Sequence, residues 1–180
     1  MKASYQHATF AGGCFWCLVA PFEAIDGVIN IVSGFTGGTV SNPSYEQVCA
    51  GQTGHFEAVH ITFDPERTDY ATLLHTFWLQ IDPSDAGGSF YDRGQHYQSA
   101  VFYHDETQQQ IAQKSILNLH ENPKLKAKIA TQLLAFSDFY PAEDYHQNYH
   151  HKNPSHYQRY RSGSGRDAFL QQLWSKENAE

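Results

Sequence analysis

Apolar residues recur along this chain at two spacings, and together these spacings predict both strands and helices. Runs of β-branched and aromatic residues bounded by Gly, Pro or Asp are typical of strands, and they occur at residues 6–11, 28–35, 55–63, 100–103 and 133–139. Stripes at a spacing of three or four residues are typical of amphipathic helices, and they occur from about residue 14 to 25 and at residues 45–49, 69–81, 105–120 and 167–174. Residues 140–161 show neither spacing, so we expect irregular chain there, followed by a flexible joint at Ser162–Gly165.

Three polar residues mark where helices are expected to begin. Ser44, Asp69 and Asp105 each precede an apolar stripe, at a position where a side-chain oxygen can accept a bond from an unpaired backbone N–H group. Pro21 falls inside the first predicted helix. Because proline has no N–H group to donate, we expect it to kink or restart that helix.

Strands and helices mix without the strict alternation that a parallel sheet requires, so we predict the α+β class. The length fits one domain over residues 1–180, and no internal repeat is present. Two segments are longer than ordinary connections, namely the Gly- and Asp-rich loop 84–97 and the Tyr- and His-rich segment 140–161. Long loops in compact domains are usually functional, so we expect site residues in them.

The composition excludes several kinds of function. The net charge is −7 and no long basic run is present, which argues against binding to nucleic acids or to a membrane surface. No apolar run approaches the roughly 20 residues that span a bilayer, and the N-terminus lacks the apolar core of a signal peptide. Three cysteines do not form the paired framework of a secreted protein, so we expect a cytoplasmic protein. The negative charge and the lack of a large apolar stripe favour a monomer.

The stretch Gly12–Cys17 carries two cysteines three positions apart, at the end of a predicted strand and the start of a predicted helix. A thiol at a helix N-terminus faces unpaired N–H groups, which favour the thiolate and lower its pKa. The stretch therefore indicates a nucleophilic or redox cysteine at Cys14. Two other interpretations stay open: a buried structural cysteine, or half of a zinc site, although Cys49 is the only further cysteine and no second pair exists.

Glu57 lies within the predicted strand 55–63, on the same face as Val59, Ile61 and Phe63. A carboxyl group on a core-facing position has a raised pKa and can donate a proton near neutral pH. The alternatives are that this end of the strand is solvated, or that Glu57 pairs with a basic residue.

Other polar residues are weaker candidates. Tyr45, Asp92 and Tyr97 stand in loops marked by Gly or Pro, although each alone is more typical of a surface or packing residue. His146 and His150 are four residues apart, a spacing at which two metal ligands share a helix face. Because the chain has eleven histidines, packing and hydrogen bonding explain that pair, and the neighbouring His151, better than a metal does.

Motifs along most of the chain resemble those of the A-type peptide methionine sulfoxide reductases. They match in order and approximate spacing from about residue 8 to 155, and they are Gly12–Trp16, Gly34–Gly38, Asn42–Tyr45 with Val48 and Cys49, Thr53–Val59, Phe77–Trp78 with Asp82–Pro83, Asp92–Tyr97 and Ala142–Gln147. The chain, with its Arg159–Gly165 tail, is most similar to bacterial members whose motif begins G-C-F-W-C. We therefore expect a two-layer sandwich with a ferredoxin-like core, a mixed and mainly antiparallel sheet under helices, and long loops on the C-terminal side.

The resemblance implies reduction of the S epimer of methionine sulfoxide, free or protein-bound, without a prosthetic cofactor. Cys14 would attack the sulfoxide sulfur and become a sulfenic acid, and Glu57 would protonate the departing oxygen. The implied binding residues are Tyr45 and Tyr97 as donors to that oxygen, Asp92 for the substrate amide or a water, and Phe15 and Trp16 as the wall for the methyl group.

Regeneration of Cys14 distinguishes this chain from many relatives, because no cysteine follows Cys49. Our hypothesis is a Cys14–Cys17 disulfide that thioredoxin or another dithiol reduces, with Cys49 structural. The alternative is direct reduction of the sulfenic acid by an external thiol. A general thiol–disulfide oxidoreductase and a zinc- or haem-binding module are the competing classes. Two departures from the family pattern, His96 and Phe35, leave the proposed site residues in place.

Overall fold

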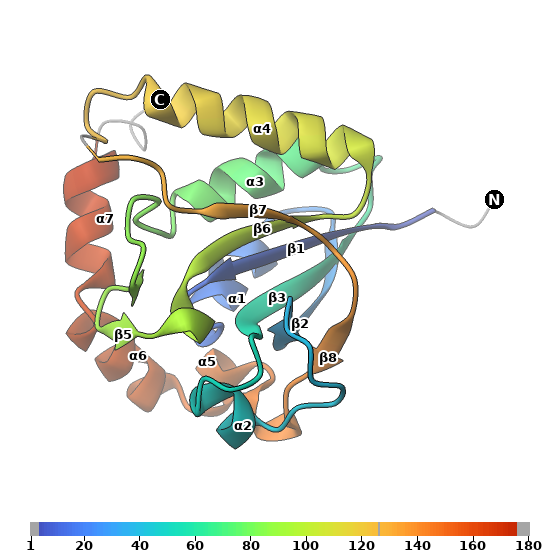
Figure 1. Cartoon of the computed structure of the whole chain (residues 1–180), viewed down its shortest axis with the longest axis vertical. Helices are drawn as coiled ribbons and strands as arrows, with labels where there is room; N and C mark the ends of the chain where they lie inside the picture. Colours follow the sequence, from blue (N-terminus) through green and yellow to red (C-terminus); the bar gives the residue numbers. More distant parts are fainter. Residues whose placement is uncertain (1–3, 126, 176–180) are drawn as a thin grey trace.

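The computed structural model describes residues 4–125 and 127–175, and its centre is a six-stranded sheet (Figure 1). The strands are β1 (Gln6–Gly12), β2 (Val28–Thr36), β3 (Phe56–Phe63), β6 (Ser99–Tyr103), β7 (Gln132–Ala135) and β8 (Phe139–Pro141). They lie in the order β7-β6-β1-β3-β2-β8, and every neighbouring pair is antiparallel except β6 with β7. A separate two-stranded ribbon pairs β4 (Gly88–Ser89) with β5 (Asp92–Arg93). The predicted mixed, mainly antiparallel sheet is confirmed.

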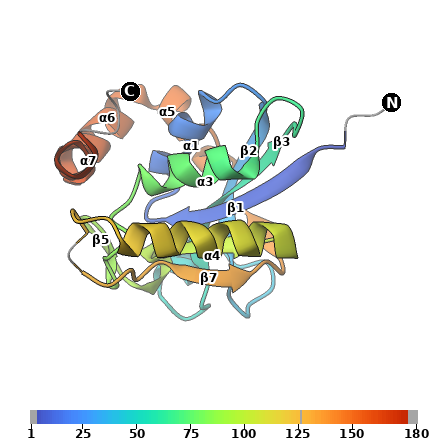
Figure 2. The same cartoon turned by 90° about the horizontal axis from the view of Figure 1, so that it is seen from above.

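Helices pack against one face of the sheet (Figure 2). They are α1 (Trp16–Glu23), α3 (Tyr70–Trp78) and α4 (Glu106–His120). α1 leads from β1 to β2 and α3 leads from β3 towards β6, yet β3 lies between β1 and β2 in the sheet. These connections are split β-α-β units, in which a third strand separates the two that a helix joins. The α+β class is confirmed, and the ferredoxin-like description stays a prediction.

The larger core lies between this face and the helices. Phe10 of β1 stacks on Phe77 of α3, with ring centroids 4.9 Å apart, and on Phe22 of α1 at 5.5 Å. All three side chains are fully buried, and such burial contributes roughly 1.5–3 kcal/mol for each. The core therefore fixes the end of β1 against the start of α1, where Cys14 lies.

The two edge strands are joined across the other face of the sheet. β7 ends at Ala135 and β8 begins at Phe139, although they lie at opposite edges of the six strands. A flat sheet of this size would separate its edges by about 24 Å, whereas four steps of extended chain reach about 14 Å. The sheet must therefore curl, and Figure 1 shows this connection crossing it. The single strand predicted over residues 133–139 is wrong, because Ser137 and Asp138 leave the sheet.

Residues 140–161 contain helices rather than irregular chain, which corrects the expectation from the sequence. These are the single turn η2 (Asp144–His146), α5 (Tyr149–Lys152) and α6 (Pro154–Gly163), and α7 (Arg166–Trp174) follows. α6 has no buried residue, so it lacks the apolar stripe on which a helix prediction depends. The predicted flexible joint at Ser162–Gly165 is instead the end of α6 followed by a tight turn, in which Gly165 has a φ of +78°.

The three predicted helix caps are confirmed. The side chains of Ser44, Asp69 and Asp105 each accept a bond from the backbone N–H group three residues on, at 3.3, 2.7 and 2.8 Å. Ser44 begins the short helix α2 (Tyr45–Cys49). In the part of the chain that the structure describes, no helix is long and apolar enough to span a bilayer.

Candidate active site

The turn between β1 and α1 carries both cysteines of the pair. Gly13 follows β1 with a φ of +86°, a conformation that favours glycine. A side chain there would also meet the Cβ of Ser89 at 2.6 Å. Cys14 is 6% exposed and Cys17 is fully buried, so the turn holds two thiols inside the molecule at the start of a helix.

Glu57 of β3 lies beside this turn, and its side chain is only 1% exposed. The backbone N–H group of Phe15 donates to Oε2 of Glu57 at 3.2 Å, while the buried Oε1 has no hydrogen-bond partner among the described residues. Burial raises the pKa of Glu57 to about 8, against the lowering effect of the Phe15 bond. The carboxyl group is therefore protonated at neutral pH, with one oxygen free to donate.

The two thiols differ in the direction of their pKa shifts. Burial raises the pKa of Cys14 well above its usual value, and the hydrogen bond with Cys17 and the nearby Glu57 add to the rise. The same bond lowers the pKa of Cys17 to about 7, with help from the charges of Arg166 and Arg161. The expected lowering of the Cys14 pKa is corrected, because burial and neighbouring side chains dominate over the helix terminus.

Pro21 accounts for the arginine that reaches Cys17. α1 runs unbroken from Trp16 to Glu23, so the expected restart at Pro21 is not observed. Because Pro21 has no N–H group, the carbonyl of Cys17, four residues earlier, loses its usual helical donor. Nη1 of Arg161 in α6 donates to this carbonyl at 3.0 Å instead. The proline therefore creates a place for a positive charge beside Cys17.

A second arginine, Arg166 at the start of α7, is 1% exposed. Nη2 donates to the carbonyl of Gly12 at 3.1 Å and Nη1 to that of Gln80 at 2.6 Å. The guanidinium also lies 4.8 Å from the ring centroid of Phe90. Within residues 4–125 and 127–175 it forms no ion pair with a carboxylate. A buried cation without an anionic partner is costly, and a thiolate at Cys17 can supply that partner.

The two aromatic residues between the cysteines have different surroundings. Phe15 is 1% exposed and packs against Phe35, with ring centroids 5.9 Å apart. Trp16 is half-buried, and its indole stacks on Tyr149 of α5 at 3.8 Å with an interplanar angle of 5°. Its Nε1 donates to Nδ1 of His146 at 3.1 Å. Of the two aromatic side chains, Trp16 is therefore the one that a ligand can reach.

Tyr45, at the start of α2, and Tyr97, at the end of the single turn η1 (Gln95–Tyr97), both lie near Glu57 and Cys14. Burial raises the pKa of both hydroxyl groups, and the nearby Glu57 and Cys14 raise it further. Both tyrosines therefore remain hydrogen-bond donors close to the two groups that the sequence marks as reactive. Tyr45 also interacts with the thiol of Cys49, whose pKa burial raises.

Asp92 of β5 accepts a hydrogen bond from the hydroxyl group of Tyr160 in α6. Burial and the nearby Cys14 raise the pKa of Tyr160, so this hydroxyl also lies close to the thiol. The charge of Asp92 in turn raises the pKa of both Cys14 and Glu57. The structure thus brings Asp92 to the predicted site together with a tyrosine that the sequence did not indicate.

Several residues near the site were missed by sequence reasoning. Three of them lie in the segment 140–161, which showed no periodicity, and the fourth lies just after the predicted joint. The only signal was that the Arg159–Gly165 tail, which contains two of them, resembles that of bacterial family members. The missed residues are Tyr149, Tyr160, Arg161 and Arg166.

The histidines at positions 146 and 150 do not share a helix face. His146 ends η2, His150 lies in α5, and Asn148 between them has a left-handed φ of +53°. His150 and His151 instead bond to the carboxylate of Glu23.

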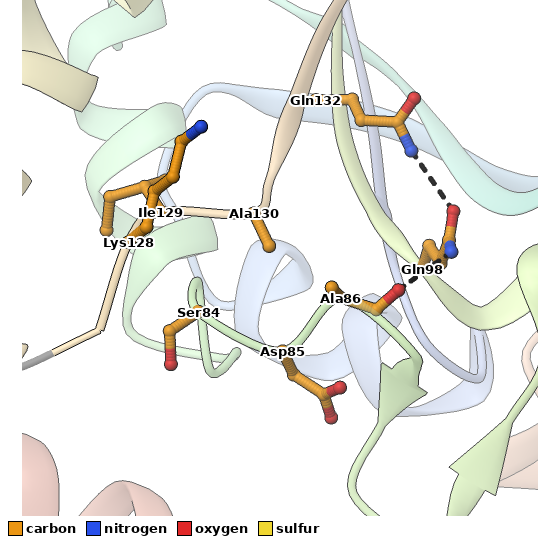
Figure 3. A pocket seen from close by; sticks show the side chains of 8 residues that line it. All are labelled: Ser84, Asp85, Ala86, Gln98, Lys128, Ile129, Ala130 and Gln132. Carbon is orange, nitrogen blue, oxygen red and sulfur yellow. Dashed lines mark hydrogen bonds between the residues drawn. The ribbon is translucent and has the colours of Figure 1, made fainter.

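A groove of about 510 Å³ shares no residue with this site (Figure 3). It is lined by Ser84, Asp85, Ala86, Gln98, Lys128, Ile129, Ala130 and Gln132. Figure 3 shows Gln132 donating to the side-chain oxygen of Gln98, at 3.1 Å. Groove volume therefore does not locate the chemistry, which lies in the more enclosed turn around Cys14.

The paired thiols and the fold assign the chain to the thiol-dependent oxidoreductases. Residues 6–178 match the model of one family, described as peptide methionine sulfoxide reductase. MsrA of Bacillus licheniformis is 53% identical over 180 residues, which cover 100% of this chain and 99% of that protein. The chain belongs to the peptide methionine sulfoxide reductase family, and the resemblance found in its motifs is confirmed.

Solved structures agree with this assignment. Reduced Mxr1 of Saccharomyces cerevisiae superposes with a TM-score of 0.77 at 29% identity, over 86% of this chain and 89% of that one. Methionine sulfoxide reductase A of Corynebacterium diphtheriae gives a TM-score of 0.77 at 30% identity, over 86% and 77% of the two chains. The curled sheet and its helices are therefore shared with these enzymes.

Proposed function

We propose that this chain, as one catalytic domain, reduces the S epimer of methionine sulfoxide, free or within proteins, to methionine. The observation that carries the proposal is the convergence of the Cys14 thiol and the protonated, buried carboxyl group of Glu57. A sulfoxide requires both groups, because its oxygen leaves readily only when it is protonated. Disulfide exchange requires only thiols.

In the first step, the sulfur of Cys14 forms a bond to the sulfoxide sulfur. Glu57 protonates the sulfoxide oxygen, and the Cys14 proton passes to the Glu57 carboxylate so formed, which restores the acid. The oxygen is transferred to Cys14 as a sulfenic acid, methionine leaves, and the two electrons that reduce the substrate come from Cys14.

Groups on opposite sides of the substrate sulfur distinguish its epimers. Tyr45 and Tyr97 donate hydrogen bonds to the oxygen from one side, and Trp16, backed by Phe15, accepts the methyl group on the other. Asp92 orients the substrate amide or a site water. In the other epimer the methyl group and the oxygen exchange places, which leaves the tyrosine hydroxyls facing an apolar group.

Cys17 regenerates the enzyme. Its thiolate attacks the sulfur of the Cys14 sulfenic acid and a disulfide forms. The displaced hydroxide takes a proton from solvent and leaves as water. The lowered pKa of Cys17 supports this role, as does the 3.0 Å bond from its N–H group to the Cys14 carbonyl, which keeps the two residues within one turn. A thioredoxin dithiol then reduces the disulfide; the yeast relative Mxr1 is known in complex with Trx2. The thiols supply all the electrons, so no prosthetic cofactor is required.

The test measures thiol-dependent reduction of the S and R epimers of methionine sulfoxide by the full chain. We expect reduction of the S epimer alone, and no reduction by Cys14→Ser. Turnover of the R epimer, or activity that survives in Cys14→Ser, would contradict the proposal. A small disulfide reduced faster than the sulfoxide would instead favour a general thiol–disulfide oxidoreductase, the class that the C-x-x-C pair alone suggests.

A further inference from the structure

Three potential metal ligands converge between the end of α1 and α5. Nε2 of His150 lies 2.9 Å from Oε2 of Glu23, and Nε2 of His151 lies 3.0 Å from the same oxygen. One ligand atom from each residue lies within 4.8 Å of the other two. We propose that Glu23, His150 and His151 form a site for a divalent transition-metal cation, with Zn²⁺ as the ion that fits best.

The chemistry of these ligands matches zinc. Imidazole nitrogen and carboxylate oxygen both bind Zn²⁺, at about 2.0–2.2 Å, and two histidines with one carboxylate are a known zinc set. Atoms at that distance from a tetrahedral ion lie roughly 3.3 Å from one another. The two nitrogen-to-oxygen distances here, 2.9 and 3.0 Å, are each within a few tenths of an ångström of that value.

The position of Glu23 in its helix gives an independent reason for a cation. Glu23 is the last residue of α1, where the negative end of the helix dipole disfavours a carboxylate. A divalent ion held by the three side chains neutralises both the carboxylate and the helix end.

The surroundings supply both a fixed and an adjustable ligand. The side chain of His150 is 9% exposed, so packing holds its ring, whereas His151 is 62% exposed and closes the site from solvent. A groove of about 230 Å³ adjoins Glu23 and is also lined by Asn30 and Asn148. It has room for the water molecules that complete a coordination shell.

Such an ion links two elements of the candidate active site. Glu23 ends the helix that Trp16 begins, and His150 and His151 follow Tyr149, which stacks on Trp16. Figure 2 shows α5 beside α1, on the side of the molecule where α6 follows. The cation therefore fastens α5 to α1 and steadies the Tyr149–Trp16 stack.

Equilibrium dialysis against Zn²⁺ tests the site in the full chain carrying Cys14→Ser and Cys17→Ser, which removes competing thiolates. We expect one equivalent of zinc, bound at least tenfold more weakly after His151→Ala or Glu23→Gln. His120→Ala, on the distant helix α4, is the matched control and should bind as before. Equal affinity in all variants, or no stoichiometric zinc, overturns the proposal.

Amide hydrogen exchange supplies a second readout that does not depend on catalysis. The N–H groups of His151 and Asn153 bond within α5 to the carbonyls of Asn148 and Tyr149. Zinc should slow their exchange several-fold in the chain carrying Cys14→Ser and Cys17→Ser, and leave it unchanged when His151→Ala is added, a change that is well tolerated because that side chain is exposed. Exchange rates that do not change when zinc is added to either protein also overturn the proposal.

Discussion

Cys14 and Cys17 are three residues apart, yet the groups around them have opposite character. Glu57 and Asp92, from strands, lie near Cys14 and raise its pKa together with burial. The hydrogen bond with Cys14 lowers the pKa of Cys17, and Arg166 and Arg161, from the C-terminal helices, lower it further. Both thiols share one helix start, so the helix dipole does not distinguish them.

The difference teaches that burial and the contact between the two thiols set the direction of each pKa shift, and that side chains from distant segments reinforce it. A protonated acid beside Cys14 suits attack on an oxidised sulfur, which must lose its oxygen. Positive charge beside Cys17 suits a resolving thiolate. One short turn can therefore carry two successive reactions because two different parts of the fold approach it.

Loss of the acid is expected to have the largest effect. Glu57→Gln retains the shape of the side chain and an acceptor for the Phe15 N–H group, but it cannot deliver a proton. We expect methionine formation to fall by about 10²–10⁴-fold, the usual contribution of general acid catalysis. Single-turnover assays measure this decrease. A rate of thiol alkylation equal to that of the wild type shows that the site remains folded. A loss below about tenfold would remove Glu57 from the role of proton donor.

Loss of the second thiol should separate the two reactions. Cys17→Ser should still form one equivalent of methionine, but thioredoxin-dependent turnover should fall by about 100-fold or more because the sulfenic acid persists. Intact mass checks this: after one equivalent of substrate the wild type loses two hydrogens, and the variant gains one oxygen. Cys49→Ser is the matched control and should behave as the wild type. Normal turnover of Cys17→Ser with thioredoxin would show that Cys17 does not resolve the intermediate.

The two steps should respond to pH in opposite directions. Glu57, with a pKa raised to about 8, donates only while protonated, so methionine formation should fall as pH rises above that value. Cys17, with a pKa lowered to about 7, attacks only as a thiolate, so disulfide formation should fall as pH drops below that value. Each rate should change about tenfold per pH unit beyond its pKa. Rapid-quench assays of methionine and of the disulfide give the pH profile of each step. Two profiles that change in the same direction would contradict the contrast between the surroundings of Cys14 and Cys17.

The smallest effect concerns the arginine that bonds to the Cys17 carbonyl. Arg161→Gln should raise the pKa of Cys17 and slow disulfide formation a few-fold at pH 7, because one of two nearby positive charges is lost. Thiolate absorbance against pH measures the shift. Arg159→Gln, exposed on the same helix, is the control and should leave the titration unchanged. An equal shift in both variants would mean that general surface charge, and not this contact, sets the pKa.

The sequence predicted the parts of the site that depend on local pattern. Period-two alternation placed Glu57 in the core, and glycines with a following apolar stripe placed Cys14 at a strand-to-helix turn. The direction of the Cys14 pKa shift was wrong because the helix terminus is visible in sequence, whereas burial and the approach of Glu57 depend on strands pairing.

The C-terminal helices could not be predicted for a different reason. α6 buries none of its residues, so no apolar stripe marks it, and its contributions to the site are single contacts made by Tyr160 and Arg161. The run over residues 133–139 has strand composition throughout, and only curling of the sheet divides it between two edges. Both features follow from tertiary packing that no local period encodes.

The curling of the sheet also reduces the chance that other polypeptide chains pair with its edges. Oxidised proteins are often partly unfolded, and a free strand edge offers such chains a template for aggregation. Here the two edge strands are short, with four residues in β7 and three in β8, and their connection crosses the curled sheet between them. A repair enzyme built in this way handles damaged chains while offering little backbone for them to join.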